Sequence, residues 1–299
     1  MNSQNIAVSG ATGWLGSELI RILVNNKIFL DSNIFPITSS EKIITINNSK
    51  FVTKKFENIQ ASQTFDYYFD FAFLTGEKQK NIGPQKYQEI NSEIIRNSVN
   101  FIMKNQPKVV ILASSGAIYG SYQNQENNLY SELKKVQEIK ISEVCNFVGS
   151  KLIIVRIFNL SGSGIKKIST FVLAEFIYRS SRNKKITIKS NYPVFRRYCD
   201  VSEMLNLIIE LSVTNENYVF DSGGTKIEIR ELAKRVIQIL DSSSKIFFPK
   251  INSSLSPDNY FSNSNEYENL VKKHLGLETV TLANQILLTK EALSNKKQA

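Results

Sequence analysis

Apolar and amphipathic segments alternate along the first half of the chain. Residues 5–9 (NIAVS) form a short apolar run, and later apolar positions have the spacing of one helix face, at Leu15, Leu19, Ile22 and Leu23. Further apolar runs lie at 34–38, 67–74, 109–113 and 152–158, and a helical pattern covers 86–105. Runs that are apolar at nearly every position are typical of strands buried on both faces. The pattern therefore predicts an α/β fold, with a doubly wound parallel sheet covered by helices.

The pattern changes near residue 160. A Ser-Gly-Ser-Gly loop at 161–164 is followed by mainly helical segments with short strands such as 185–189 (KITIK). A strand-then-helix pattern returns at 219–224 (VFDSGG) and 227–240. We therefore expect a sheet domain over residues 1–160 and a smaller mixed cap over residues 161–299, with some elements of the cap returning to the sheet.

Composition limits the possible classes of protein. Of 299 residues, 42% are hydrophobic and 21% are charged, as in soluble globular proteins. The N-terminal residues lack the pattern of a signal peptide, and no apolar run reaches the ~18 residues of a membrane span, so we expect a cytoplasmic protein without a membrane partner. The cysteines are Cys145 and Cys199, and the one histidine is His274. These counts argue against a cysteine-rich metal site, most zinc sites and most Ser-His-Asp hydrolases, and we predict no metal.

The net charge of +10 raises the question of an anionic partner. Basic residues are scattered in short pairs, such as Lys54-Lys55 and Lys184-Lys185, and no recognisable nucleic-acid motif accompanies them. We therefore expect a solvated basic surface and no nucleic-acid partner.

Three glycines follow the first predicted strand. Gly10, Gly13 and Gly16 lie in SGATGWLGSELI, where the first helix begins. A tight turn without β-carbons lets backbone N–H groups and a helix N-terminus approach a pyrophosphate. The position of this turn at the start of a βαβ pattern predicts a phosphate-binding loop.

A phenol and an ammonium are spaced for one helix face at 130–134 (YSELK). Tyr130 and Lys134 are four residues apart, so both project from the same side of a helix. The pair follows ASSGAIYG at 113–120 by about ten residues. By itself, the spacing also fits a half-exposed helix face with an extended lysine.

Taken together and in order, these motifs resemble the extended short-chain dehydrogenase/reductases. VSGATGWLG, ASSGAIYG and Tyr130-x-x-x-Lys134 carry the resemblance, together with RIFNLSG at 156–162, RRYCDV at 196–201 and IEIRELAKRV at 227–236. The resemblance covers nearly the whole chain. It implies a Rossmann-type NAD(P)-binding domain, a substrate-binding cap and activity on nucleotide-diphosphate sugars.

The resemblance also implies catalytic roles. Tyr130 would be the general acid/base and Ser115 would orient the reacting oxygen. A free phenol has a pKa of about 10, and the Lys134 ammonium with the positive nicotinamide ring would lower it. The dehydratases of the family carry Thr-Asp-Glu where this chain has Ser115-Gly116-Ala117, so dehydration is not expected.

Cofactor and substrate residues follow from the same comparison. The cofactor set comprises Gly10, Thr12, Gly13, Trp14, Leu15, Gly16, Ser39, Ser40, Lys42, Asn91, Tyr130 and Lys134. The substrate set comprises Ser115, Asn159 and Arg196, of which the last two would approach the diphosphate. The chain departs from the family at Arg197, where Asp is usual, at Asp200, where His is frequent, and at Asp70, which replaces a His and receives no catalytic role.

The end of the second strand decides between NADP and NAD. If the strand covers 34–38, the hydroxyls of Ser39 and Ser40 with Lys42 follow it and favour NADP. If it covers 28–30, Asp31 would hold the ribose hydroxyls and favour NAD. The first register gives the longer strand, and we expect NADP.

Three functions remain open. We expect NADPH-dependent reduction of a keto sugar on a nucleotide diphosphate. The alternatives are an epimerase with tightly held NAD and a non-catalytic NADP-binding regulator, although the retained Ser115, Tyr130 and Lys134 argue against the regulator. The resemblance further implies a homodimer formed through paired helices.

Overall fold

The computed structural model of the chain describes residues 3–29, 32–120, 128–165, 168–252 and 254–295. It divides into two compact units. The first comprises residues 1–120, 124–156 and 208–220, and the second comprises residues 121–123, 157–207 and 221–299. Each unit is described by itself below.

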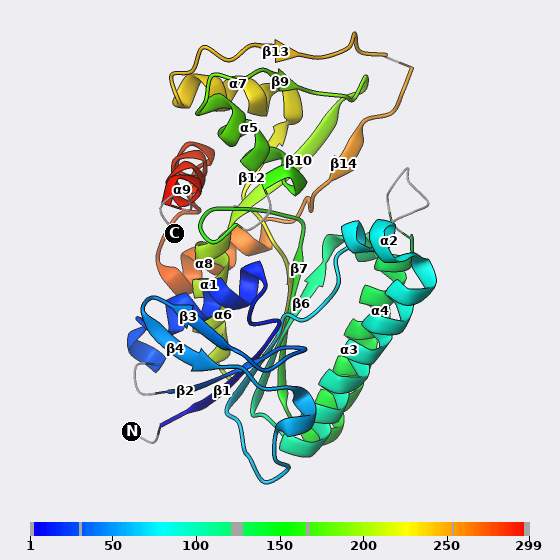
Figure 1. Ribbon diagram of the computed structural model, residues 1–299, viewed down its shortest axis with the longest axis vertical. Coiled ribbons are helices and arrows are strands. Elements are labelled where there is room, and N and C mark those ends of the chain that lie inside the picture. Colours follow the sequence, from blue (N-terminus) through cyan, green and yellow to red (C-terminus); the bar gives the residue numbers. More distant parts are fainter. Residues whose placement is uncertain (1–2, 30–31, 121–127, 166–167, 253, 296–299) are drawn as a thin grey trace. The chain divides into compact units, whose positions relative to one another are not determined.

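A six-stranded sheet forms the centre of the first unit, in the order β11-β7-β6-β5-β1-β2 (Figure 1). Its strands are β1 (Asn5–Ser9), β2 (Asn33–Ile37), β5 (Tyr67–Asp70), β6 (Val109–Ser115), β7 (Lys151–Ile157) and β11 (Tyr218–Asp221). Parallel pairing joins β2 to β1, β1 to β5 and β5 to β6. Every residue of β5 and β6 is buried, as expected for strands covered on both faces. The predicted parallel α/β fold is confirmed.

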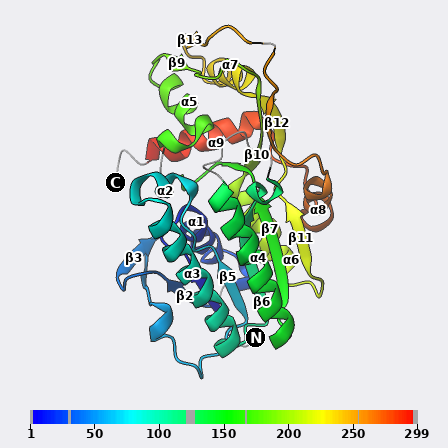
Figure 2. The same cartoon turned by 90° about the vertical axis from the view of Figure 1, so that its right-hand side faces the viewer.

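Helices cover both faces of this sheet. The long helices α3 (Pro84–Asn105) and α4 (Asn128–Val148) lie side by side on one face, and α1 (Trp14–Leu23) lies on the other (Figures 1 and 2). The short helix α2 (Gly76–Ile82) precedes α3. The core under α3 and α4 includes Tyr68, Phe101, Ile102 and Val144. Burial of this apolar face holds the two helices on the sheet.

The second strand has the register that favours Ser39 and Ser40 over Asp31. Residues Lys27–Phe29 form a 3-10 turn, whereas β2 pairs with β1 over Asn33–Ile37. Asp31 lies outside the described residues. After β2 comes an antiparallel hairpin of β3 (Ile43–Ile46) and β4 (Ser49–Val52), which the sequence pattern did not predict. Its turn uses Asn47 and Asn48 at positive φ, where asparagine is well tolerated.

Strand β5 is shorter than its apolar pattern suggests. The apolar run covers 67–74, but the strand ends at Asp70. The backbone N–H groups of Phe71 and Ala72 donate to the Ser9 hydroxyl, at 3.1 and 3.2 Å, instead of to a neighbouring strand. This side-chain contact turns the chain out of the sheet just beyond the end of β1.

The second unit combines short sheets with helices. Its main sheet has the order β12-β10-β14, and β8 also pairs with β10. The strands are β8 (Asn159–Ser161), β9 (Ile186–Thr187), β10 (Val194–Asp200), β12 (Thr225–Glu228), β13 (Ile246–Phe247) and β14 (Asp258–Tyr260). The helices are α5 (Val172–Ser180), α7 (Ile229–Ile239), α8 (Glu266–Leu275) and α9 (Leu282–Asn295), while α6 (Val201–Ser212) crosses the boundary between the units.

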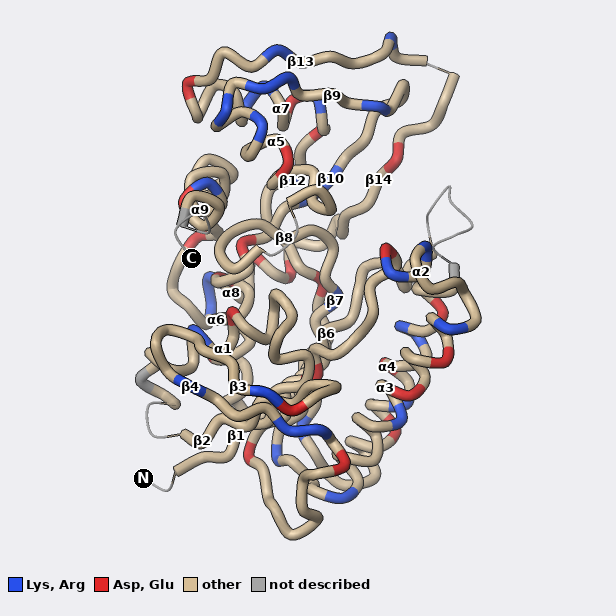
Figure 3. The backbone as a smooth tube through the Cα atoms, in the orientation of Figure 1, with Lys and Arg blue, Asp and Glu red and all other residues tan. Residues whose placement is uncertain are grey.

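Basic and acidic residues are scattered over both units (Figure 3). Short helical turns complete the described elements, at Phe56–Asn58, Gly116–Tyr119 and Ile168–Thr170.

Among the helices that the structure describes, none is both long enough and apolar enough to cross a membrane.

Candidate active site

The glycine-rich turn lies between β1 and α1 and cannot accept larger residues without rearrangement. Gly10 has a φ of +64°, and a β-carbon there would lie 2.6 Å from the carbonyl oxygen of Phe71. A β-carbon on Gly16 would lie 2.5 Å from the carbonyl oxygen of Gly10. The turn is closed by Gly13 N–H, which donates to Gly10 O at 2.8 Å. The close backbone approach thus explains why glycine occupies these positions.

Helix α1 begins immediately after this turn. Gly13 is its N-cap, and no side chain caps the helix by a hydrogen bond. The first turn of α1 also contains no acidic residue. An uncapped helix N-terminus beside a glycine turn has the polarity that a pyrophosphate requires.

A cavity of about 890 Å³ adjoins the turn. Gly10, Thr12 and Gly13 line it, with Ser39 after β2 and residues 71–74 after β5. Its size and position at the carboxyl ends of the strands fit a dinucleotide. The fit supports the predicted cofactor class, NAD or NADP.

Several residues of the predicted cofactor set do not line this cavity. Its lining does not include Trp14, Leu15, Gly16, Ser40, Lys42, Asn91, Tyr130 or Lys134. Lys55 and Glu57 line it instead, and their side chains form an ion pair at 3.1 Å. The hairpin β3–β4 lies between Lys42 and Lys55 in the sequence and turns the chain back toward β2. The position of Lys55 at the cavity depends on that hairpin, so the sequence pattern did not indicate it.

Asn91 is buried in α3 and both ends of its amide are used within the protein. Its Oδ1 accepts from the backbone N–H of Leu74 at 2.8 Å, and its Nδ2 donates to Tyr87 O at 3.2 Å. Leu74 lines the cavity. Asn91 therefore acts on the cavity through the backbone of the segment that follows β5.

The proposed catalytic residues lie close together in the first unit. Ser115 is the last residue of β6, and Tyr130 and Lys134 lie four residues apart on α4. The Ser115 hydroxyl hydrogen-bonds with the Tyr130 phenol. The backbone oxygen of Ala117 accepts from Ser131 at 2.7 Å, which fixes the start of α4 beside the end of β6.

Lys134 is 4% exposed and points into the protein. Its Nζ donates to Ala113 O at 2.8 Å and to Gln137 Oε1 at 2.9 Å. The same Nζ lies 3.9 Å from the centroid of the Phe73 ring. Three directions around the ammonium are thus taken by a carbonyl, an amide and an aromatic face.

The pKa values follow from this burial. Burial lowers the pKa of Lys134 to about 7, while Asp70 and Glu138 act in the opposite direction. Burial also raises the pKa of Tyr130, opposed by its hydrogen bond with Ser115. The pKa lowering expected for Tyr130 involved Lys134 together with a bound nicotinamide ring and stays a prediction. Among the groups of this chain, burial raises that pKa and the Ser115 hydroxyl lowers it.

An ion pair beside Lys134 was not predicted from the sequence. Arg156 on β7 donates to both carboxylate oxygens of Glu138, at 3.1 and 2.9 Å, and also to the Tyr119 hydroxyl at 2.9 Å. Glu138 follows Lys134 by one helical turn, so the pair anchors α4 to the sheet. The sequence shows that Glu138 follows Lys134 by four residues. It does not show that Arg156 on β7 pairs with Glu138.

Two of the three predicted substrate residues, Asn159 and Arg196, belong to the second unit, whereas Ser115 belongs to the first. Asn159 Nδ2 donates to Arg197 O at 3.3 Å and to Tyr260 O at 3.4 Å. Arg196 forms an ion pair with Asp258 at 2.8 Å. Arg197 pairs with Glu268 at 2.8 Å and donates to three backbone carbonyls. Arg197 is therefore an internal support of this unit rather than one of a pair of surface arginines.

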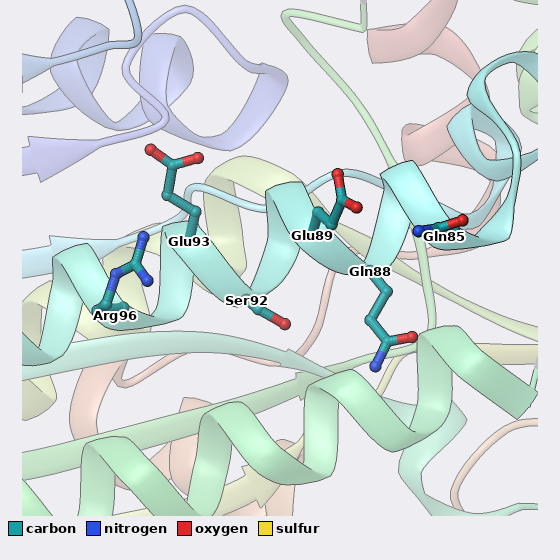
Figure 4. A pocket seen from close by; sticks show the side chains of 6 residues that line it. All are labelled: Gln85, Gln88, Glu89, Ser92, Glu93 and Arg96. Carbon is teal, nitrogen blue, oxygen red and sulfur yellow. The ribbon is translucent and has the colours of Figure 1, made fainter.

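A second hollow is lined by side chains of α3 alone (Figure 4). They are Gln85, Gln88, Glu89, Ser92, Glu93 and Arg96, and none belongs to a predicted site. Within the described part of the chain, no group of three or more His, Cys, Asp or Glu side chains is placed to hold a metal ion.

The glycine turn, the adjoining cavity and the Ser115–Tyr130 contact lie in the parallel α/β unit. The chain belongs to the NAD dependent epimerase/dehydratase family, whose model matches residues 6–219. The predicted family and enzyme class are thereby confirmed.

The similar proteins have low sequence identity to this chain. UDP-glucuronic acid decarboxylase 3 of Arabidopsis thaliana is 24% identical over 263 residues, which cover 79% of this chain and 75% of the relative. The UDP-glucose 4-epimerase of Thermotoga maritima, solved with UDP-glucose, has a TM-score of 0.77 at 20% identity and covers 98% of this chain and 99% of its own. The UDP-glucose 4-epimerase of Thermus thermophilus, solved with NAD, has a TM-score of 0.72 at 16% identity, covering 97% and 99%.

Proposed function

We propose that this protein transfers hydride between NAD(P) and one carbinol carbon of a nucleotide-diphosphate sugar. The observation that carries the proposal is the hydrogen bond between Ser115 and Tyr130 beside the buried Lys134. This arrangement supplies a proton donor and an orienting hydroxyl for one oxygen atom. The cavity beside the glycine turn would hold the cofactor.

Each residue has a separate role in the proposed reaction. When bound, NAD(P) would supply or accept the hydride. Tyr130 donates a proton from its phenolic oxygen to the substrate oxygen in reduction and accepts it in oxidation. Ser115 orients that oxygen by a hydrogen bond. Lys134 supplies positive charge near the phenolate that forms when Tyr130 releases its proton.

The two units divide the binding in this proposal. The first unit binds the cofactor through Gly10, Thr12, Gly13 and Ser39. The second binds the substrate diphosphate through Asn159 and Arg196, because a guanidinium fork matches phosphate oxygens.

Of the two candidate reactions, we favour NADPH-dependent reduction of a keto sugar. Ser39 and Lys55 line the cavity after β2, and a hydroxyl with a lysine suits a 2′-phosphate. Glu57 balances the charge of Lys55 until an anion competes for it. Gly116 and Ala117 offer no carboxyl next to Ser115, which disfavours dehydration.

Epimerisation is the second candidate. It is favoured by the description of the family as NAD dependent and by the likeness of the fold to two UDP-glucose 4-epimerases. In that reaction the hydride would leave and return within one turnover, so the cofactor would stay bound.

Cofactor retention separates the two candidates. The freshly purified protein is denatured and the released small molecules are identified by mass spectrometry, while NADPH and NADH are titrated by fluorescence. We expect an empty protein that binds NADPH more tightly than NADH. Retained NAD would instead support the epimerase, and failure to bind either would contradict the enzyme assignment.

Turnover then tests the catalytic residues. UDP-glucose, UDP-N-acetylglucosamine and UDP-glucuronic acid are incubated with NAD, and a 4-keto sugar nucleotide is incubated with NADPH. Tyr130→Phe should retain cofactor binding and lose at least about 100-fold in kcat, because the proton donor is removed. A folded Tyr130→Phe protein with full turnover would refute the role of Tyr130. Cofactor binding without turnover on any sugar would support the regulator instead.

We also propose a homodimer formed through α3 and α4. The outward side of α4 carries Val136, Ile139 and Phe147, which are 45%, 54% and 77% exposed, and Met103 of α3 is also exposed. Burial of such side chains against a second copy would be favourable. Phe147→Glu should yield a monomer in light scattering after size-exclusion chromatography. Phe247→Glu, at an equally apolar exposed site of the second unit, should remain dimeric, and a monomeric wild type would contradict the proposal.

A further inference from the structure

A buried carboxylate lies near Lys134 and is not used by the proposed reaction. Asp70 is the last residue of β5 and is fully buried. Its Oδ1 accepts from Ser9 Oγ at 2.7 Å and from the Tyr68 hydroxyl at 3.1 Å. Burying a carboxylate lowers the stability of the fold unless hydrogen-bond donors and a positive charge compensate it.

The Ser9 hydroxyl has only one direction in which to donate. Its oxygen accepts from the backbone N–H groups of Phe71 and Ala72. Its single hydrogen therefore points to Asp70, at 2.7 Å. Oδ1 of Asp70 is therefore an acceptor. Burial raises the pKa of the Asp70 carboxyl, while the donors Ser9 and Ser98 and the charge of Lys134 lower it and favour the ionised form.

Gln137 connects Asp70 to Lys134. An ammonium can only donate, so the amide oxygen of Gln137 must face Lys134, at 2.9 Å. The amide nitrogen then faces Asp70 Oδ2, at 3.3 Å. Gln137 is fully buried, and its amide polarity thus runs from the cation to the anion. The amide carries no titratable proton, so this chain of contacts transmits charge rather than a proton.

Few charged groups face Lys134 from the elements around it. Asp70 comes from β5, and Glu138 comes from the same helix and is already paired with Arg156 of β7. The phenol of Tyr130 lies on the preceding turn of α4. Because burial brings the pKa of Lys134 to about 7, a nearby negative charge decides whether the lysine is ionised in neutral solution. Asp70 is the larger of the two contributions that favour the ammonium.

We propose that Asp70 is a positioning residue whose buried carboxylate, acting through the Gln137 amide, holds Lys134 in place and favours its ammonium form. The inference rests on the proposed function only for the role of Lys134 beside Tyr130. Asp70 itself does not touch the reacting atoms. It stabilises the charge that the phenolate of Tyr130 would need.

The test follows Lys134 directly by NMR, without cofactor or substrate. Protein labelled with ¹³C-lysine is titrated from pH 5 to 11, and the Cε signal of Lys134 is assigned by its loss in Lys134→Met. Asp70→Asn removes the charge at nearly constant volume. We expect the titration midpoint of Lys134 to move to lower pH by about one unit or more, because the compensating anion is lost.

Asp66→Asn is the matched control. Asp66 lies just before the other end of β5 and pairs with Lys108 at 2.7 Å. That variant should lower the midpoint of Lys108 and leave Lys134 unchanged. Each aspartate would then act on its own lysine.

Two variants at Gln137 carry the test if Asp70→Asn does not fold. Gln137→Met removes the amide and should lower the midpoint of Lys134 by a smaller amount. Gln137→Glu places a carboxylate in contact with Lys134 and should raise the midpoint, alone or combined with Asp70→Asn. An unchanged Lys134 midpoint in Asp70→Asn, or in both Gln137 variants, would overturn the proposal.

The experiment distinguishes a wrong proposed function from a wrong role for Asp70. The titration needs no turnover, so an inactive protein can still show the coupling of Asp70 to Lys134. If turnover is found, the alkaline limb of its pH profile should move to lower pH in Asp70→Asn and stay in place in Asp66→Asn.

Discussion

The Lys134 ammonium lies 3.9 Å from the centroid of the Phe73 ring, which also makes an edge contact with the Tyr130 ring at 5.8 Å. One aromatic side chain thus touches both proposed catalytic residues. Phe73 also lines the cavity beside the glycine turn. Its ring keeps water from the ammonium while offering the ammonium its π face.

Two substitutions of Phe73 should therefore have opposite effects on Lys134. Phe73→Leu keeps the site apolar but removes the π face, so the titration midpoint of Lys134 should fall by roughly half a pH unit. Phe73→Ala admits water, and because burial is the main cause of the lowered pKa, the midpoint should rise. Both midpoints are measured by ¹³C-lysine NMR. Shifts in the same direction would contradict this account of the contact.

Gly10 should be far more sensitive to substitution than a glycine without close neighbours. Gly10→Ala places a β-carbon 2.6 Å from Phe71 O at a positive φ, so it should cost more than about 2 kcal/mol and weaken cofactor binding at least tenfold. Gly83 has a φ of +81° and no atom within 4 Å of a β-carbon, so Gly83→Ala should cost about 1 kcal/mol and leave binding unchanged. Urea unfolding and cofactor titration measure both. Equal effects at the two sites would show that the clash with Phe71 is unimportant.

The fold and the placement of Tyr130 and Lys134 on one helix could be predicted from the sequence because their signals are local. Apolar runs identify buried strands, glycine spacing identifies the turn, and a four-residue spacing places Tyr130 and Lys134 on one helix face. The parallel sheet was confirmed, while the roles of Ser115, Tyr130 and Lys134 remain predictions.

Contacts that depend on where the chain leaves the sheet could not be predicted. Phe73 reaches Lys134 because β5 ends early, when Phe71 and Ala72 donate to Ser9. Asp70 was visible only as an unusual residue, since its link to Lys134 passes through Gln137 on another element. Lys55 lines the cavity because the β3–β4 hairpin precedes it; Asn47 and Asn48 are residues typical of a hairpin turn, but they do not indicate where the chain runs after the hairpin.

Lys134 should also make the stability of the fold depend on pH. Its folded pKa of about 7 lies below the usual value of 10.5. Below pH 7 the lysine is ionised in both states, and the cost of its burial is fully present. Between pH 7 and 10.5 the unfolded state binds the additional proton, so this cost disappears as the pH rises.

The free energy of unfolding of Lys134→Met should therefore exceed that of the wild type by the largest amount at low pH. Its advantage in unfolding free energy should be larger at pH 6.5 than at pH 9.5 by on the order of 2 kcal/mol, measured by urea denaturation. Lys108→Met is the control. Its pairing with Asp66 raises the pKa of Lys108, so the titration falls above this range. A pH-independent difference for Lys134→Met would contradict the lowered pKa.

Neighbouring arginines on β10 should have different functions. The Arg197 side chain is 12% exposed, pairs with Glu268 and donates to the carbonyls of Gly224, Ser262 and Ser264. Arg197→Gln leaves the Glu268 charge unpaired and these acceptors unsatisfied. It should lower the unfolding free energy by about 2–4 kcal/mol, measured by urea denaturation.

Arg196→Gln should instead act on the substrate. Arg196 pairs with Asp258 at 20% exposure, and a diphosphate could compete with that single carboxylate. We expect at least a tenfold higher KM for the sugar nucleotide, an unchanged cofactor Kd and a loss of about 1 kcal/mol in stability. Asp258→Asn, which releases the Arg196 guanidinium, should lower the KM. If Arg196→Gln left the KM unchanged, Arg196 would be a structural partner of Asp258 alone, and the diphosphate would have to be bound by other residues.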